Sequence, residues 1–154
     1  MKGLKFLVWF LFLQLFWSCS WVQYFLVVNE SNQPIEISYT LTPPEKTFAI
    51  FDATTDAYEL KAKGSLNWEK KLTLADADTT NEKVMITLPA NAALIFGRLH
   101  NDKYTSYNQY FINGRSFNLA ELTIKTAQKT TSILPETFDN YFKEQNGNIV
   151  WVEK

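Results

Sequence analysis

The sequence predicts an all-β fold: an antiparallel β-sandwich, Ig-like or similar, with one short C-terminal helix and a signal segment in front. Three observations support this prediction. Short apolar or alternating segments recur along the chain at roughly 8–12-residue spacing, which is typical of sandwiches and barrels. Aromatic residues make up 16% of the chain and favour strands over helices. The length of 154 residues suits a single domain.

The first two strands are expected over residues 24–28 and 35–41. The apolar residues of the second segment occupy alternate positions: Ile35, Ile37, Tyr39 and Leu41. A polar stretch of five residues, 29–33, separates the two segments, and this arrangement predicts a β-hairpin. Pro43 and Pro44 end the second strand, because proline cannot donate a hydrogen bond to a neighbouring strand.

Further strands are expected in segments bounded by turn residues: 47–51, 58–62, 66–74, 83–88, 92–99, 104–112, 115–119, 122–126 and 149–152. Segment 66–74 has the clearest alternation, with Lys70 as the only break in its apolar face. Asn113 and Gly114 follow 104–112 and predict a two-residue hairpin turn. Many short strands joined by turns support the sandwich.

One helix is expected to begin at Pro135, and Gly147 is expected to cap its far end. Glu136 and Asp139 suit the positive end of a helix dipole. Its apolar stripe, spaced i, i+3 and i+4, consists of Phe138, Tyr141 and Phe142. We expect this helix to cover an open end or edge of the sandwich.

The N-terminal segment has the layout of an export signal. Lys2 and Lys5 form a basic start, and residues 6–17 are apolar apart from a single glutamine. Ser18 then supplies a small residue ahead of Cys19, which is the only cysteine of the chain. A basic start, an apolar run of this length and a small residue before the cut are the parts of a secretory signal. The sequence therefore predicts an exported protein.

Residues 16–19, of sequence FWSC, resemble the lipobox of bacterial lipoproteins. The first two of these residues are bulkier than those usual at their positions. The resemblance implies that 1–18 are a lipoprotein signal peptide, cleaved just before Cys19, and that Cys19 carries a diacylglyceryl thioether. Residues 19–154 then form a single sandwich-like domain tethered to a membrane by its lipid. Without a free thiol that domain has no disulfide and no cysteine nucleophile.

Two further expectations concern the membrane. Ser20, rather than an aspartate, follows the cysteine, which resembles lipoproteins sorted to the outer membrane, and we expect the domain to face the periplasm. No flexible linker precedes the first predicted strand, so the domain is expected to lie close to the bilayer. Three alternatives remain: an ordinary signal peptide cut nearby, with Cys19 as an incidental thiol; an uncleaved helical anchor over residues 6–28; and a buried core helix.

Charge and composition limit the classes of partner and cofactor. The net charge is −1, and without Lys2 and Lys5 the balance is 13 basic against 16 acidic residues. No basic patch is present, so a nucleic-acid partner is not expected. His100 is the only histidine and is interpreted as an ordinary strand-end residue, so no metal site and no cofactor are expected.

The densest aromatic cluster is the candidate binding surface. It consists of Tyr104, Tyr107, Tyr110 and Phe111. Amphipathic rings of this kind stack on sugars or anchor a partner protein. In a strand, Tyr104 and Tyr110 would lie on one face and the other two on the opposite face, so one pair would pack in the core.

The polar stretch 76–82 holds two weaker signals. Its acidic residues resemble a calcium loop, but the glycine and terminal glutamate of an EF-hand are absent, and we interpret it as a solvated loop. Asp78-Thr79-Thr80 resembles a short O-glycosylation signal of some Gram-negative envelopes, which would modify Thr79. The Asn29-Glu30-Ser31 triplet matches an N-glycosylation acceptor, which is relevant only in a eukaryotic secretory pathway.

The function expected from these features is a lipid-anchored, non-enzymatic binding or accessory module of the bacterial envelope, with a protein or glycan partner. No catalytic residue is predicted, since no nucleophile motif accompanies the single histidine. One alternative is a small glycan-processing enzyme using paired carboxylates, Asp52 with Asp56 or Glu136 with Asp139. The other is a purely structural envelope lipoprotein.

Overall fold

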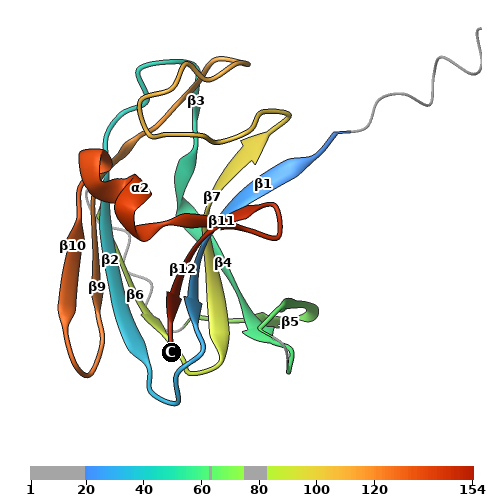
Figure 1. Ribbon diagram of the computed structural model, residues 1–154, viewed down its shortest axis with the longest axis vertical. Coiled ribbons are helices and arrows are strands. Elements are labelled where there is room, and N and C mark those ends of the chain that lie inside the picture. Colours follow the sequence, from blue (N-terminus) through green and yellow to red (C-terminus); the bar gives the residue numbers. More distant parts are fainter. Residues whose placement is uncertain (1–19, 63, 75–82) are drawn as a thin grey trace, which may run out of the picture.

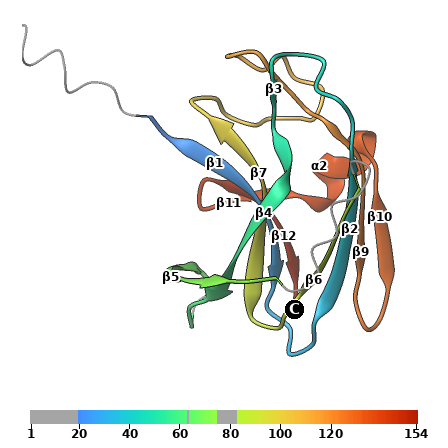
Figure 2. The ribbon, with the colours of Figure 1, turned by 180° about the vertical axis from the view of Figure 1, so that it is seen from behind.

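The computed structural model describes residues 20–62, 64–74 and 83–154. Two β-sheets pack face to face, and a short pair of strands lies at one end of them (Figures 1 and 2). The predicted all-β sandwich is therefore confirmed. Cys19, Thr79 and the rest of the polar stretch 76–82 lie outside the described residues.

The larger sheet, called sheet A, has six strands in the order β11-β12-β1-β7-β4-β5. Their bounds in that order are Lys143–Gln145, Asn148–Glu153, Val22–Asn29, Ala92–His100, Phe51–Leu60 and Leu66–Leu72. β1 is parallel to β12 and antiparallel to β7. The first strand of the domain is thus held by the last strand on one side and by a central strand on the other.

The smaller sheet, sheet B, has four antiparallel strands in the order β10-β9-β2-β6. Their bounds in that order are Thr130–Ile133, Leu119–Lys125, Ile35–Leu41 and Lys83–Leu88. The short third pair consists of β3 (Phe48–Ala49) and β8 (Arg115–Ser116), which run parallel. β10 and β11 are strands that the sequence pattern did not predict.

The core lies between the two sheets and is rich in aromatic rings. Its largest fully buried aromatic side chains are Tyr39, Phe25, Phe51, Phe96 and Phe138. The Tyr39 hydroxyl donates a hydrogen bond to the Asp52 carbonyl at 2.6 Å, and burial raises its pKa well above the usual value. The buried phenol is therefore satisfied and neutral.

The predicted hairpin between residues 24–28 and 35–41 is wrong, although both strands form. β1 belongs to sheet A and β2 to sheet B, so the polar turn crosses from one sheet to the other. Asn29 holds this crossing: it is fully buried, and its side-chain amide donates to the carbonyls of Gln33 at 2.8 Å and Pro89 at 2.9 Å. A polar turn predicts that the chain reverses direction. It does not predict that the two strands it joins will be hydrogen-bonded to each other.

The predicted strand over residues 104–112 is also wrong, because this segment forms a loop. The Tyr104 N–H donates to the side-chain oxygen of Gln23 at 2.7 Å instead of to a neighbouring strand. Asn113 and Gly114 both have positive φ, as a tight turn requires, but the turn leads into β8, which pairs with β3. The predicted hairpin therefore does not form here.

The predicted C-terminal helix is much shorter than expected. A 3₁₀ turn over Pro135–Thr137 leads into α2, which covers only Phe138–Tyr141. Gly147 is not a helix cap but lies, with φ 79°, in the turn between β11 and β12. The segment after α2 becomes extended because the edge of β12 offers hydrogen-bonding groups to β11. Of the predicted apolar stripe, Phe138 and Phe142 enter the core, with ring centroids 4.2 Å apart.

Candidate binding groove

The outer face of sheet A, turned away from sheet B, is apolar. Five side chains form a second buried cluster there: Leu26, Val28, Ala93, Ile95 and Val150. They alternate along β1, β7 and β12 with residues of the main core, so both faces of these strands are covered. Continuous apolar runs are typical of strands buried on both faces.

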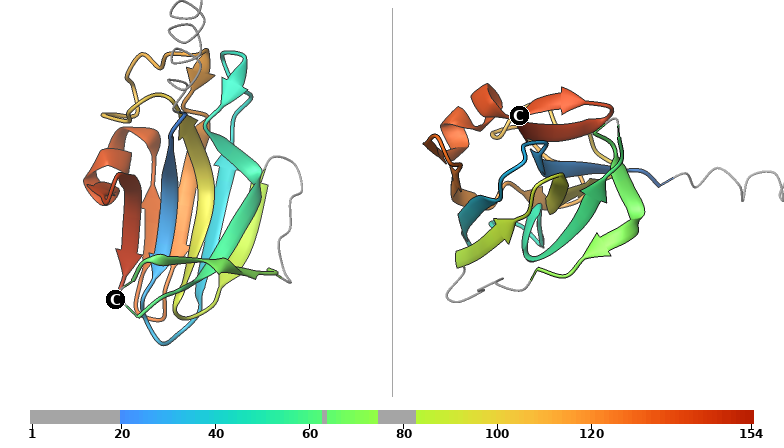
Figure 3. Two further views of the ribbon diagram at one scale, coloured as in Figure 1. Left: turned by 90° about the vertical axis from the view of Figure 1, so that its right-hand side faces the viewer. Right: turned by 90° about the horizontal axis from the view of Figure 1, so that it is seen from below.

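Strand β5 supplies part of this second cover. It leaves the edge of sheet A next to β4 and crosses in front of the sheet (Figure 3, left). The Trp68 ring of β5 lies 5.5 Å from the ring of Tyr24 on β1 and 5.1 Å from that of Tyr58 on β4. Even so, 52% of Trp68 is exposed. One side of the indole therefore packs on the sheet while another side stays open to solvent.

A groove runs along this open side, between β5 and the β11–β12 hairpin. We call it the Trp68 groove. It consists of two adjoining hollows of about 210 Å³ and about 420 Å³, which share Trp68, Asn146 and Asn148 as lining residues. Other residues used below also line one hollow or the other: Trp21, Gln23, Tyr24, Leu26, Glu30, Gly64, Lys103, Glu144, Gln145 and Gly147.

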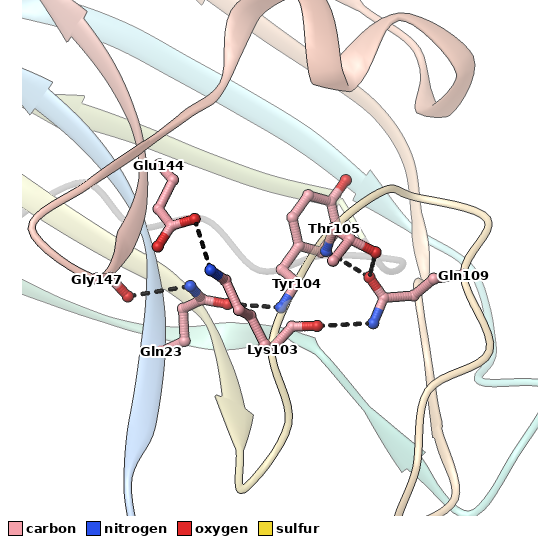
Figure 4. A network of polar contacts seen from close by, with 7 residues as sticks. All are labelled: Gln23, Lys103, Tyr104, Thr105, Gln109, Glu144 and Gly147. Atoms are coloured by element: carbon pink, nitrogen blue, oxygen red, sulfur yellow. Dashed lines mark hydrogen bonds and ion pairs between the residues drawn. The ribbon is translucent and has the colours of Figure 1, made fainter.

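The polar wall of the groove is the tight turn of the β11–β12 hairpin. Asn146 and Gly147 both have positive φ there. The buried Gln23 side chain donates to the Gly147 carbonyl at 3.0 Å (Figure 4), and the Asn148 side-chain oxygen accepts the Tyr24 N–H at 3.1 Å. These two bonds fix the turn to β1, so the amides on it are held in place.

The charges in the groove are few. In its larger hollow Lys103 is paired with Glu144 at 3.1 Å, as Figure 4 shows. In the smaller hollow Glu30 lies against Gly64, where a Cβ would come within 2.5 Å of its carboxylate oxygen. Gly64 also has φ 73°, so only glycine suits this turn. An aromatic surface with neutral amides, one ion pair and one further carboxylate, that of Glu30, suits a polar ligand without negative charge.

The structure separates the three tyrosines of the expected binding surface. Tyr104 is only 5% exposed, and its hydroxyl donates to the Asp139 carboxylate at 2.5 Å. Burial, and then Asp139, raise the pKa of this hydroxyl far above its usual value. Tyr107 is half-buried beside Phe117, whereas Tyr110 is exposed, with the Lys46 ammonium 4.2 Å from its ring centroid. The Tyr104 ring belongs to the core, and a role for Tyr110 in binding stays a prediction.

In each pair of carboxylates proposed for catalysis, one member has other partners. Asp56 is paired with Arg98 and, at 2.5 Å, with Lys71. Asp139 accepts hydrogen bonds from the Tyr104 hydroxyl and from the Tyr107 N–H. Within the part of the chain that the structure describes, no three acidic, histidine or cysteine side chains gather as a metal site would need.

His100 lies at the end of β7, as the sequence predicted. Burial lowers its pKa below the usual value, and the nearby Arg115 and Arg98 lower it further. The imidazole is therefore neutral at pH 7. Among the residues that the structure describes, no serine, threonine or other nucleophile forms a hydrogen bond with the His100 side chain.

The sequence contained signals for this groove that the tyrosine cluster obscured. The unbroken apolar run of residues 24–28 indicates a strand buried on both faces, which requires a second cover. Trp68 stands on the apolar side of segment 66–74, the strand with the clearest alternation. Bringing the two together needed the tertiary structure, because β5 and β1 are not neighbours in the sheet.

A scan against protein-family models found no match, and searches of curated proteins and of solved structures found no significantly similar protein. Across residues 20–62, 64–74 and 83–154, no helix has the length and apolar character that a membrane span needs.

Proposed function

We propose that this protein is an exported lipoprotein of the bacterial envelope, anchored through an acylated Cys19, that binds a glycan chain in the Trp68 groove without chemistry of its own. The observation that carries the proposal is the half-exposed Trp68 indole, held on Tyr24 and Tyr58 within a groove walled by amides. The ligand class that best suits these groups is a neutral chain of N-acetylated sugars.

The choice of a glycan follows from the chemistry of the groove. A flat ring that is already supported from behind can stack on the apolar face of a sugar without losing conformational freedom on binding. Gln145, Asn146 and Asn148 offer both donors and acceptors, which match hydroxyl and acetamido groups. Nucleic acid is disfavoured, because the one lysine in the groove is neutralised by Glu144.

The anchor is supported by the sequence. Residues 1–18 have the parts of a signal peptide and end in the lipobox-like FWSC. The first strand begins at Val22, so the folded domain starts almost directly after the cysteine. With Ser20 next to Cys19, we place the protein on the outer membrane, facing the periplasm.

Binding without catalysis is favoured by the state of the titratable groups. Asp56 and Asp139 are already engaged in ion pairs or hydrogen bonds, and neither lines the Trp68 groove. Catalysis of glycoside hydrolysis needs two carboxyl groups that face each other across the bound sugar. The groove has two carboxylates, but they line different hollows, and one of them, Glu144, is paired with Lys103.

The test uses the full chain expressed in a Gram-negative host and extracted from its membranes in detergent. Intact mass, measured beside a Cys19→Ala variant, should show loss of residues 1–18 and addition of acyl chains only when Cys19 is present. The same preparation is then titrated with a tetramer of β-1,4-linked N-acetylglucosamine while the heat of binding is recorded by calorimetry, a readout that does not depend on the Trp68 fluorophore. We expect a saturable change that Trp68→Ala abolishes.

Tyr110→Ala is the matched control, because Tyr110 is an exposed aromatic residue outside the groove. It should bind the tetramer as the unchanged protein does. Loss of binding with Tyr110→Ala and not with Trp68→Ala would return the site to the tyrosine surface expected from the sequence. Binding that survives both substitutions would contradict the proposed groove.

A further inference from the structure

The end of the sandwich at which β1 begins carries an unusual share of exposed apolar side chains. The start of β1, strand β3 and the loop after β7 all lie at this end, the top of Figure 1 and of the left view of Figure 3. Four large apolar side chains of these segments are 46–81% exposed: Trp21, Phe48, Tyr110 and Ile112. We call these four residues the docking end.

Hydrogen bonds connect the segments that carry the docking end. Asn101 exchanges two hydrogen bonds with the backbone of Trp21, both at 3.0 Å. The neighbouring Asp102 carboxylate accepts the Ile112 N–H at 2.9 Å, which closes the loop after β7. The Phe48 N–H donates to the Gly114 carbonyl at 3.0 Å. The four side chains thus stand on adjoining segments rather than on distant parts of the molecule.

The loop that carries Tyr110 and Ile112 is held rigidly. The Gln109 side chain bonds to Lys103 and Thr105, and the buried Gln23 bonds to the Tyr104 N–H, as Figure 4 shows. On the other side of the loop, Asp139 accepts the Tyr104 hydroxyl. A loop fixed in this way presents apolar side chains to a partner with little loss of conformational freedom on binding.

We infer that the docking end inserts its side chains into the surface of the bilayer that holds the lipid anchor, an inference that rests on the proposed acylation of Cys19. Cys19 is two residues ahead of Trp21, so their Cα atoms are at most about 7 Å apart. An acylated Cys19 therefore brings this end of the domain, and no other, against the lipid headgroups.

The composition of the docking end suits that position. Trp and Tyr are enriched where proteins meet the headgroup region, because their rings are apolar with a polar edge. Charge is mixed: Lys46 and Arg115 lie over the rings of Tyr110 and Phe48, and the Asp102 carboxylate accepts the Ile112 N–H. We therefore expect apolar insertion rather than attraction to anionic lipid to hold the domain. A domain docked in this way keeps one orientation, in which the larger hollow of the Trp68 groove, lined in part by Trp21, lies next to the docking end.

The experiment uses single cysteines, because an acylated Cys19 leaves no other thiol in the chain. The full chain with Tyr110→Cys, or with Met85→Cys as control, is extracted, nitroxide-labelled and reconstituted into vesicles of phosphatidylethanolamine with phosphatidylglycerol. Met85 is 49% exposed on the outer face of sheet B. Collision rates of each label with oxygen and with a water-soluble nickel complex report its depth.

We expect the Tyr110→Cys label to be several-fold more accessible to oxygen relative to nickel than the Met85→Cys label. Adding Phe48→Ser and Ile112→Ser to the labelled Tyr110→Cys chain should abolish most of that difference. An acylated protein whose two labels are equally aqueous would overturn docking while leaving the anchor intact. An unacylated mass would overturn the anchor itself, and with it the reason for this end to face the bilayer.

Discussion

The outer faces of the two sheets differ sharply. On sheet A the outward side chains of β1 and β7 are apolar and buried, and β5 covers part of them. On sheet B the outward positions hold polar residues and one methionine, and they are open to solvent: Glu36, Ser38, Met85, Thr87, Thr123 and Lys125. A sandwich needs only two buried faces, and this one has a third.

This difference between the outer faces of the two sheets explains how the Trp68 groove arises. β6 alternates strictly between exposed and buried residues, whereas β7 is buried along most of its length. A strand with apolar residues on both sides has to be covered twice, and β5 is too short to cover the whole face. The Trp68 groove is the part of the third buried face that the chain leaves incomplete. This explains why the hollow has an apolar floor and a polar wall.

The largest expected effect compares the two outer faces directly. Leu26→Ala should lower the free energy of unfolding by about 2–4 kcal/mol, because it leaves a cavity under the cover of sheet A. Met85→Ala on the open face should change it by no more than about 0.5 kcal/mol. Urea unfolding followed by tryptophan fluorescence measures both. Equal effects would mean that β5 does not cover sheet A in solution.

A smaller effect tests the contact between β5 and the sheet. In a double-mutant cycle, Tyr24→Ala and Trp68→Ala should show a coupling energy of about 1 kcal/mol, because the two rings pack against each other. The pair Tyr24→Ala and Met85→Ala, on opposite sides of the sandwich, serves as control and should be additive within about 0.5 kcal/mol. Additivity in both cycles would show that Trp68 does not rest on β1.

The smallest effect concerns the protonation of His100, the one histidine of the chain, which lies at the end of β7 in sheet A. The pKa of His100 is lower in the folded protein than in the unfolded chain, so the unfolded chain binds the proton more readily. Its contribution to stability is therefore complete above the ordinary pKa of about 6.5 and decreases as the pH falls below it.

We expect the free energy of unfolding to fall slightly between about pH 7.5 and about pH 5.5, by less than about 1 kcal/mol because His100 is largely exposed. His100→Gln should remove this dependence. A decline of the same size in the variant would assign it to other groups.

Much of the sandwich was predictable from the sequence. Segments 35–41 and 83–88 match β2 and β6, and 92–99 matches β7 to within one residue. Each has a clear apolar pattern and is bounded by residues that favour turns, such as Pro43, Pro89 and Asn91, the last with φ 54°. The secondary structure of these strands depends on local pattern and turn chemistry, which the sequence contains.

The wrong predictions of secondary structure lie in segments whose local sequence suits two conformations about equally well. Tyr104 could begin a strand or anchor a loop, and the buried side chain of Gln23 decided for the loop. The segment after Phe142 could continue a helix, but the free edge of β12 drew it into β11. In both places the deciding group lies far away in the chain, or belongs to a strand that exists only once the sheet has formed.

The fold class, most strand positions and the expectation of an exported, lipid-anchored domain followed from the sequence, because periodicity, turn residues and the signal layout are local properties. Three features became visible only in the folded molecule. β1 and β2 belong to different sheets, the Tyr104 ring lies in the core, and the Trp68 ring packs against the Tyr24 ring on the outer face of sheet A. Pairing and burial depend on the packing of segments distant in the chain, which no local pattern specifies.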